Sequence, residues 1–125
     1  MSRMSRKSRF ARQIRADVQF ELDAADRAEA RTDAGVAFRH LERAHVLGQA
    51  TTALHLRVHW RMLLWALRHR NPGEAAGQLW RLAGAALLTG IGMVPTGNTG
   101  GAGVSGLRRM PIADDLLRAI DAARR

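Results

Sequence analysis

The chain has 125 residues, 46% of them hydrophobic, so it is long enough for one buried core and is not expected to be disordered. It contains no cysteine, which excludes disulfides, thiolate metal sites and thiol catalysis. The net charge of +9 comes almost entirely from arginines spread along the chain. No nucleic-acid-binding motif or aromatic stacking platform accompanies them, so we expect no specific nucleic-acid partner.

The first twelve residues are basic and serine-rich, and we expect them to form a flexible tail ahead of a single helical-bundle domain over residues 13–125. This tail could contact acidic partners or anionic lipid. No apolar segment of a secretory signal follows it, which favours a cytoplasmic protein. No transmembrane segment is expected either, because the nearly uncharged stretch 82–94 is too short to cross a bilayer and is better explained as part of a buried helix.

Helical periodicity, with caps at each break, predicts an all-α fold. We expect a compact antiparallel bundle of four main helices, at about 11–30, 33–47, 52–69 and 72–89. A glycine-rich loop and a short C-terminal helix from about residue 111 complete it. The third helix is apolar nearly all round, so it should be the central and most buried one. The side chains expected to be largely buried are Trp60, Leu63, Leu64, Leu79 and Leu82.

The second and third helices should form a tight hairpin. Gly48 is a helix terminator, and Thr51 or Thr52 can cap the next helix, so the connection is very short and the two helices should be antiparallel. Folding the chain about residue 50 places His45 opposite His55 and Glu42 opposite His59.

Helical phases turn these four side chains inward. At about 100° per residue, Glu42 and His45 share the apolar side of the second helix. On the third helix, His55 and His59 lie opposite a narrow arc of arginines formed by Arg57, Arg61 and Arg68. His40 and His69 fall outside the group and are expected to have structural roles.

The pattern predicts a metal site made of Glu42, His45, His55 and His59. Histidines at i and i+4 can share one ion, and Glu-x-x-His is a pair that metal-binding helical bundles use. Ligand atoms should lie roughly 2.0–2.2 Å from the ion. Nitrogen and oxygen ligands without sulfur suit zinc, copper, nickel, cobalt or iron, and the sequence does not choose among them. Candidate supporting residues are Glu21, Gln49 and Asn98.

Other interpretations of the four residues remain open. The histidines could be core residues that hydrogen-bond Glu42 and the backbone without an ion, in a structural or interaction module. Haem binding or direct acid–base chemistry would also use buried histidines. A metal-dependent enzyme, hydrolytic or oxygen-activating, would need an open coordination position, whereas a di-iron centre would need more carboxylates. A homo-oligomer is not excluded.

A glycine-rich segment from Gly90 to Gly106 follows the fourth helix. It lacks the Walker lysine and does not match the dinucleotide fingerprint, so phosphate binding is weakly supported. We expect Gly97 to Gly103 to pack near the open end of the histidine site, to move more than the helices, and to bring Asn98 close as a polar contact.

Three motifs carry a resemblance to a known family. They run from Leu41 to Gln49, from His55 to Leu63 and from Val94 to Gly101, and they resemble a small bacterial family, domain of unknown function 3703, over about residues 36–111. A tryptophan often stands in that family where this chain has Arg61 and Met93, which affects the expected local packing. Members tend to be encoded near metal-resistance or metal-efflux genes, so the resemblance implies metal handling, such as buffering, sensing or resistance.

Overall fold

The computed structural model describes residues 4–49, 51–90, 100 and 109–125, and of residues 85–90 only the backbone. Within these residues the chain forms five helices and no strand, which confirms the all-α prediction. The helices are α1 (Arg6–Ala30), α2 (Ala34–Gly48), α3 (Thr52–Arg68), α4 (Pro72–Gly90) and α5 (Asp114–Arg124). None of them combines the length and apolar character that a membrane crossing requires.

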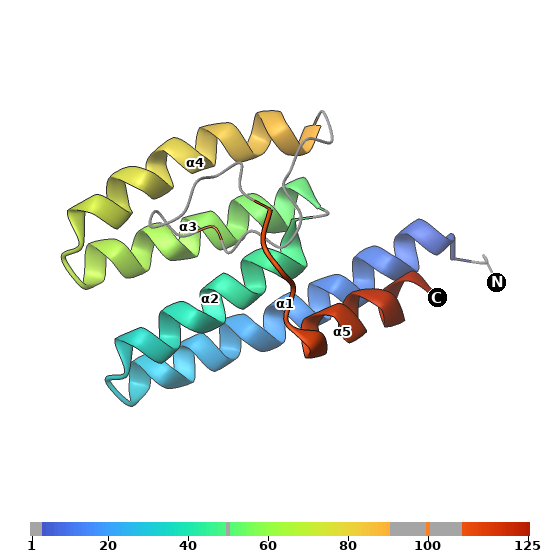
Figure 1. The fold of residues 1–125 in the computed structure, drawn as a ribbon, viewed down its shortest axis with the longest axis horizontal. Helices are drawn as coiled ribbons and strands as arrows, with labels where there is room; N and C mark the ends of the chain where they lie inside the picture. Colours follow the sequence, from blue (N-terminus) through green and yellow to red (C-terminus); the bar gives the residue numbers. More distant parts are fainter. Residues whose placement is uncertain (1–3, 50, 91–99, 101–108) are drawn as a thin grey trace.

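The helices form two antiparallel hairpins, α1 with α2 and α3 with α4, and α5 packs along α1 (Figure 1). The hairpins meet where α2 ends and α3 begins, and α2 and α3 diverge from that corner (Figure 1). Phe38 and Trp65 pack between the diverging ends, with ring centroids 4.4 Å apart. The Trp65 indole N–H also donates to the carbonyl of Ala34. The helices α2 and α3 therefore form a V. The short connection between them fixes its corner, and the packing of Phe38 against Trp65 fixes its open end.

The turn inside each hairpin is built in the same way. A residue in the left-handed region, Thr32 (φ 58°) in one and Arg70 (φ 51°) in the other, ends the first helix. The next residue, Asp33 or Asn71, caps the following helix by accepting a backbone N–H bond. Backbone bonds from Asp33 to Ala28 and from Asn71 to Ala66, both 2.9 Å, close each turn as in a Schellman motif.

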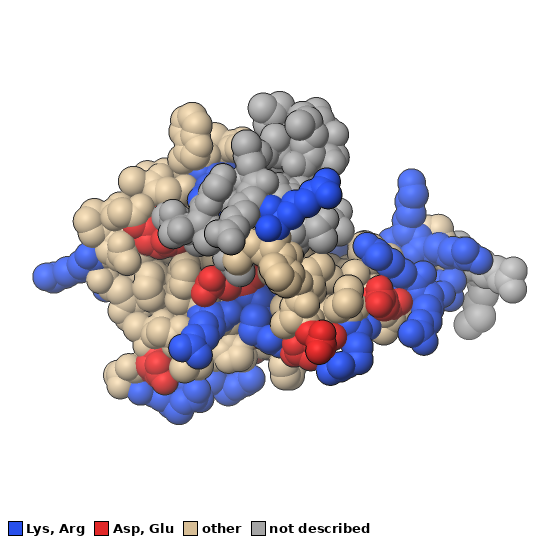
Figure 2. Space-filling view, viewed as in Figure 1, with Lys and Arg blue, Asp and Glu red and all other residues tan. Residues whose placement is uncertain are grey.

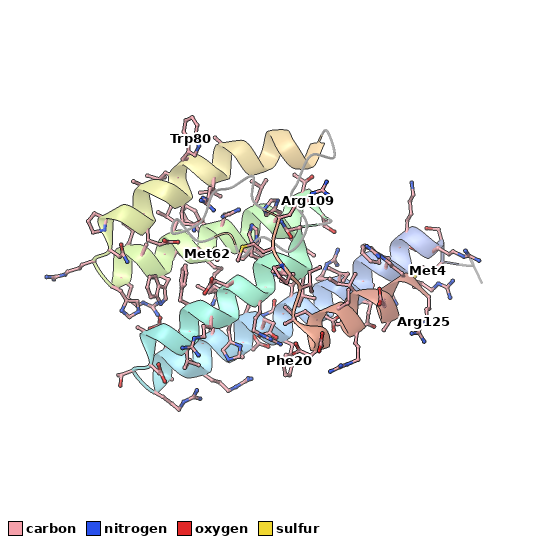
Figure 3. All side chains as sticks on the ribbon, in the orientation of Figure 1. Met4, Phe20, Met62, Trp80, Arg109 and Arg125 are labelled. Carbon is pink, nitrogen blue, oxygen red and sulfur yellow. The ribbon has the colours of Figure 1, made fainter. Side chains whose placement is uncertain are left out.

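One apolar core joins both hairpins. On α1 it comprises Ile14, Val18 and Leu22, and the buried side chains of α2, α3 and α5 surround these. The core members from the other helices include Leu41, Ala44, Leu47, Leu54, Val58, Met62 and Leu116. The sulfur of Met62 lies inside the molecule, next to α3 (Figure 3). A smaller cluster of Leu63, Ala66 and Ala75 joins α3 to α4.

The arginines expected to line the polar side of α3 are used for packing against α1. Arg57 donates to Gln19 at 2.7 Å, and Arg61 pairs with Asp26. Arg68 and His69 both pair with Glu29. Arg61 is therefore held in an ion pair between α3 and α1. These contacts set the rotation of α3 and turn its histidines away from α1.

The expectation that Trp60, Leu64 and Leu79 are largely buried is wrong, because all three are exposed. Leu63 is buried as predicted, and Leu82 is half-buried. The reason is architectural: two hairpins meeting at a corner surround α3 on fewer sides than a closed bundle would. One apolar side of α3 and α4 therefore faces solvent.

Helix boundaries agree with the expectations at α2, α3 and α4 and differ at the two chain ends. α1 begins at Arg6, so residues 6–12 of the expected tail are helical, and Ser5 caps them by accepting from the Ser8 N–H. α5 begins at Asp114, three residues after Pro111, with Asp114 and Asp115 in its first turn. Among its apolar side chains, Leu116 is buried, Ile120 half-buried and Leu117 exposed.

Candidate metal centre

Three histidines converge at the corner between α2 and α3. His45 belongs to the last turn of α2, and His55 and His59 lie one turn apart in the first half of α3. The corner is tight: the Thr51 N–H donates to the Gly48 carbonyl, and a Cβ at Gly48 would lie 3.5 Å from Leu54. All three imidazoles are buried, with at most 4% exposed.

The three imidazoles approach each other through the same ring atom. The Nε2 of His45 lies 2.8 Å from that of His55 and 3.0 Å from that of His59, and the last two are 3.1 Å apart. Folding the chain about residue 50 placed His45 opposite His55, and His45 lies almost as close to His59. This group, which we call the histidine cluster, holds ligand atoms close enough together for one metal ion.

Gln78 of α4 orients one of the three rings. Its side chain is completely buried, and its Oε1 lies 2.6 Å from His59 Nδ1. Because an amide oxygen only accepts, the neutral His59 must carry its proton on Nδ1 and present a lone pair at Nε2. Gln78 is itself held by two bonds from its Nε2, to Glu74 Oε1 and to the Gly100 carbonyl, both 2.8 Å.

Burial favours the neutral, lone-pair-bearing form of these rings. Desolvation, with a smaller contribution from the neighbouring His59, lowers the pKa of His55 to about 4. Desolvation also lowers the pKa of His59; the hydrogen bond that His59 donates to Gln78 opposes that shift, and the charge of Arg81 adds to it. At neutral pH both are therefore able to act as ligands.

Gly100 lies directly against the ring of His45. It has φ +82°, and a Cβ there would approach three His45 ring atoms at 2.4–2.7 Å. Gly100 is also buried, and its carbonyl accepts from Gln78. The expectation that the glycine-rich segment packs near the site holds at this residue, whereas the rest of 97–103, and Asn98, lie outside the described residues.

A family model described as Protein of unknown function (DUF3703) matches residues 12–120. The chain belongs to this family. The match confirms the resemblance inferred from the three motifs and extends it to most of the chain. No curated protein and no solved structure matches this DUF3703 chain.

The remaining predicted site residues of this DUF3703 protein occupy different places. Glu42 is half-buried on α2, one turn before His45, and its role as a ligand stays a prediction, as does that of Gln49 as a supporting residue. Glu21 is buried and accepts from His40 Nδ1 at 2.7 Å and from Arg43 Nε at 3.0 Å. His69 pairs with Glu29. In their described contacts, Glu21, His40 and His69 therefore belong to ion pairs between helices.

The sequence analysis did not identify Gln78 as part of the site. It placed Gly100 near the site but did not predict the contacts of Gly100 with His45 and Gln78. Both depend on contacts between residues about twenty or more positions apart, which helical periodicity does not predict. One signal was available: Gln78 is a polar residue on the side of α4 that faces α3, and a polar side chain buried there needs specific partners.

Proposed function

We propose that this protein binds one transition-metal ion through the Nε2 atoms of His45, His55 and His59. The observation that carries the proposal is the mutual approach of these three atoms, at 2.8–3.1 Å. Ligands about 2.0–2.1 Å from one ion stand about 2.9–3.4 Å from each other in octahedral or tetrahedral geometry. The spacing of the cluster is close to this range.

Hydrogen bonding alone explains such a triangle poorly. The Nε2 of neutral His59 has no proton, and His45 and His55 can each offer at most one. Each N–H can point at only one acceptor, so at most two of the three contacts can be hydrogen bonds. The third would bring two lone pairs, or two N–H groups, together in a buried place. A cation at the convergence of the lone pairs removes this conflict.

Charge supports Glu42 as a fourth ligand. Three neutral imidazoles leave the full charge of a divalent ion uncompensated in a buried site, which is costly. A carboxylate one turn before His45 would halve that charge. Nitrogen and oxygen ligands of this kind suit zinc, copper(II), nickel, cobalt or iron. A small helical protein with one such site fits a role in metal handling, by buffering or sensing the ion.

The test is metal binding by protein purified without a histidine tag. Elemental analysis should find about one metal ion per chain after loading and dialysis. Competition titrations with zinc, copper(II) and nickel should show that His45→Ala and His59→Ala each lower the affinity more than about 100-fold, since even outer partners of a ligand typically contribute about 10–100-fold.

The matched control is His69→Ala, because His69 pairs with Glu29 outside the cluster. It should bind metal like the parent. Glu42→Gln separates the fourth ligand from the first three. A loss of metal affinity that is smaller than in the histidine variants supports Glu42 as a ligand that contributes less to the affinity. If His45→Ala and His59→Ala both bind every metal as the parent does, the proposal is wrong and the cluster is structural.

A further inference from the structure

The α3–α4 hairpin exposes a broad apolar surface. Its large members are Trp60, Leu64, Leu67, Leu79 and Trp80, with exposed fractions of 53, 41, 59, 60 and 81%. Ala76 and Ala83 are exposed beside them on α4. None of these seven residues, which we call the hairpin face, carries a charge, although the chain has 20 lysines and arginines. A patch of this kind usually marks an interaction surface.

The seven residues lie on one side of the hairpin. Positions 60, 64 and 67 follow the i, i+4, i+7 spacing of one helical stripe, and 76, 79, 80 and 83 do the same on α4. His55, His59 and Gln78 project from the opposite sides of the same two helices. Trp80 points outward from α4, away from the rest of the molecule (Figure 3). The hairpin face is therefore the side turned away from the histidine cluster.

We propose that the hairpin face is a dimer interface that packs against the same face of a second copy. A helix that is apolar nearly all round is expected to be buried all round, yet the described part of the chain covers α3 from the sides of α1, α2 and α4 and leaves Trp60, Leu64 and Leu67 exposed. Two α3–α4 hairpins placed face to face form a layer of four helices with a new apolar core. In that arrangement α3 is covered on every side, as its sequence requires.

The exposed area is sufficient for such a dimer. Taken with their exposed fractions, the five large side chains present about 500–700 Å². A twofold interface would bury that area on both copies, about 1,000–1,400 Å² in total, which reaches the size of small stable interfaces. The two exposed tryptophans are also the residue type most enriched among residues that dominate binding energies.

Charge favours a second copy over an acidic partner. The face itself is neutral, so it offers nothing to a negatively charged surface. Two copies at +9 each repel one another at long range, so salt should strengthen the dimer by screening this repulsion. Association with an acidic partner would weaken as salt is added.

The test is sedimentation of the full chain at about 1–200 µM, at low and high salt. We expect a monomer–dimer equilibrium that shifts toward dimer with salt. Leu79→Glu and Trp60→Glu should each raise the dissociation constant at least about tenfold. The matched control is Phe20→Glu, because Phe20 is 66% exposed on α1, outside the face, and this variant should dimerise like the parent.

Because all three substituted side chains are exposed, the variants should keep the helical circular dichroism of the parent. If the parent stays monomeric at every concentration and salt, the proposal is wrong. It is equally wrong if the monomeric parent binds phosphatidylcholine vesicles and floats with them, since the face would then serve a membrane. Dimers that survive both glutamate substitutions overturn it as well. His59→Ala should dimerise normally, so the metal site and the interface can fail independently.

Discussion

Gln78 determines which nitrogen of His59 faces the cluster. Its amide oxygen accepts a hydrogen bond from His59 Nδ1, and its amide nitrogen donates to Glu74 Oε1 and to the Gly100 carbonyl. One fully buried side chain thus connects α3, α4 and the residue that packs on His45. Groups that fix a ligand in this way typically contribute strongly to metal affinity without touching the ion.

Replacing this side chain should weaken metal binding while leaving the three histidines in place. Gln78→Leu removes the acceptor at similar volume and should lower the affinity about 10–100-fold. Gln78→Glu keeps an acceptor for His59 and should recover part of that loss, although it cannot donate to Gly100 or to Glu74. Competition titration measures both, with the exposed Gln13→Leu as control. Unchanged binding by Gln78→Leu would show that the His59 tautomer is fixed by something else.

Gly100 should tolerate no side chain. In Gly100→Ala the Cβ would lie 2.4 Å from His45 Cδ2, and φ +82° is unfavourable for alanine, so either the ring or the backbone must move. We expect a loss of metal affinity of at least about tenfold, together with a lower melting temperature. Gly35→Ala is the control, because a Cβ there meets nothing within 4 Å and alanine favours helix. Parent-like affinity in Gly100→Ala would separate this residue from the site.

At this scale the sequence predicts the approach of the three histidines better than their surroundings. The i, i+4 spacing of His55 and His59 and the short corner at Gly48 are local features, and they correctly bring His45 to both. The partners Gln78 and Gly100 come from α4 and from beyond it. Their approach depends on how the second hairpin sits on the first, which spacing along the chain does not specify.

At the scale of elements, the two hairpin turns show most clearly which features the sequence predicts. Their caps, Asp33 and Asn71, were predictable because Asp and Asn favour this position. Their left-handed residues were not, because threonine and arginine rarely take a position that usually belongs to glycine. The turns therefore hold some strain that the surrounding helices overcome.

Removing that strain should stabilise the protein. Thr32→Gly relieves a β-branched residue at φ 58°, which costs about 1–2 kcal/mol, and part of this gain is offset by the greater freedom of glycine in the unfolded chain. We expect a net gain of about 0.5–1 kcal/mol in the free energy of unfolding, measured by urea denaturation. Arg31→Gly, at φ −88°, has no such strain to relieve and should destabilise. A loss of stability in Thr32→Gly would mean that the threonine makes compensating contacts.

The prediction about α3 failed at the same scale for a related reason. Its apolar pattern indicates a helix that packs on several sides, but a pattern does not say which of these sides the same chain covers. The arc of Arg57, Arg61 and Arg68 contacts the acidic and amide side chains of α1. That contact rotates Trp60 and Leu64 outward.

At the scale of the whole molecule, positive charge and apolar surface are separated. Lysines and arginines gather around the beginning of α1 and along the lower edge of the molecule, whereas the described surface of α4 is largely uncharged in the same view (Figure 2). The composition predicts the excess of arginine but not this distribution, because the distribution follows from how the two hairpins pack.

The metal-free protein should lose stability in mild acid. The pKa of His55 is about 4 in the folded state and about 6.5 when unfolded, so the unfolded chain binds more protons between these values. The free energy of unfolding therefore has its full value above about pH 6.5. It falls as the pH approaches 4, and this residue accounts for about 3 kcal/mol of the loss. Thermal melts at stepped pH with a chelator present test this, with His55→Phe as the variant that should lose much of the dependence, since the lowered pKa of His59 remains. A flat profile in the parent would contradict the burial of an unprotonated His55.

The hairpin arrangement also bears on the order of folding. Most packing joins helices that are neighbours along the chain, and such local topologies generally fold within microseconds to milliseconds. The packing of α5 on α1 instead closes nearly the whole chain into a loop, at a greater entropic cost (Figure 1). We therefore expect α5 to dock last. The corner between α2 and α3 would by then already hold its histidines together, so that an ion could join the chain while folding is still under way.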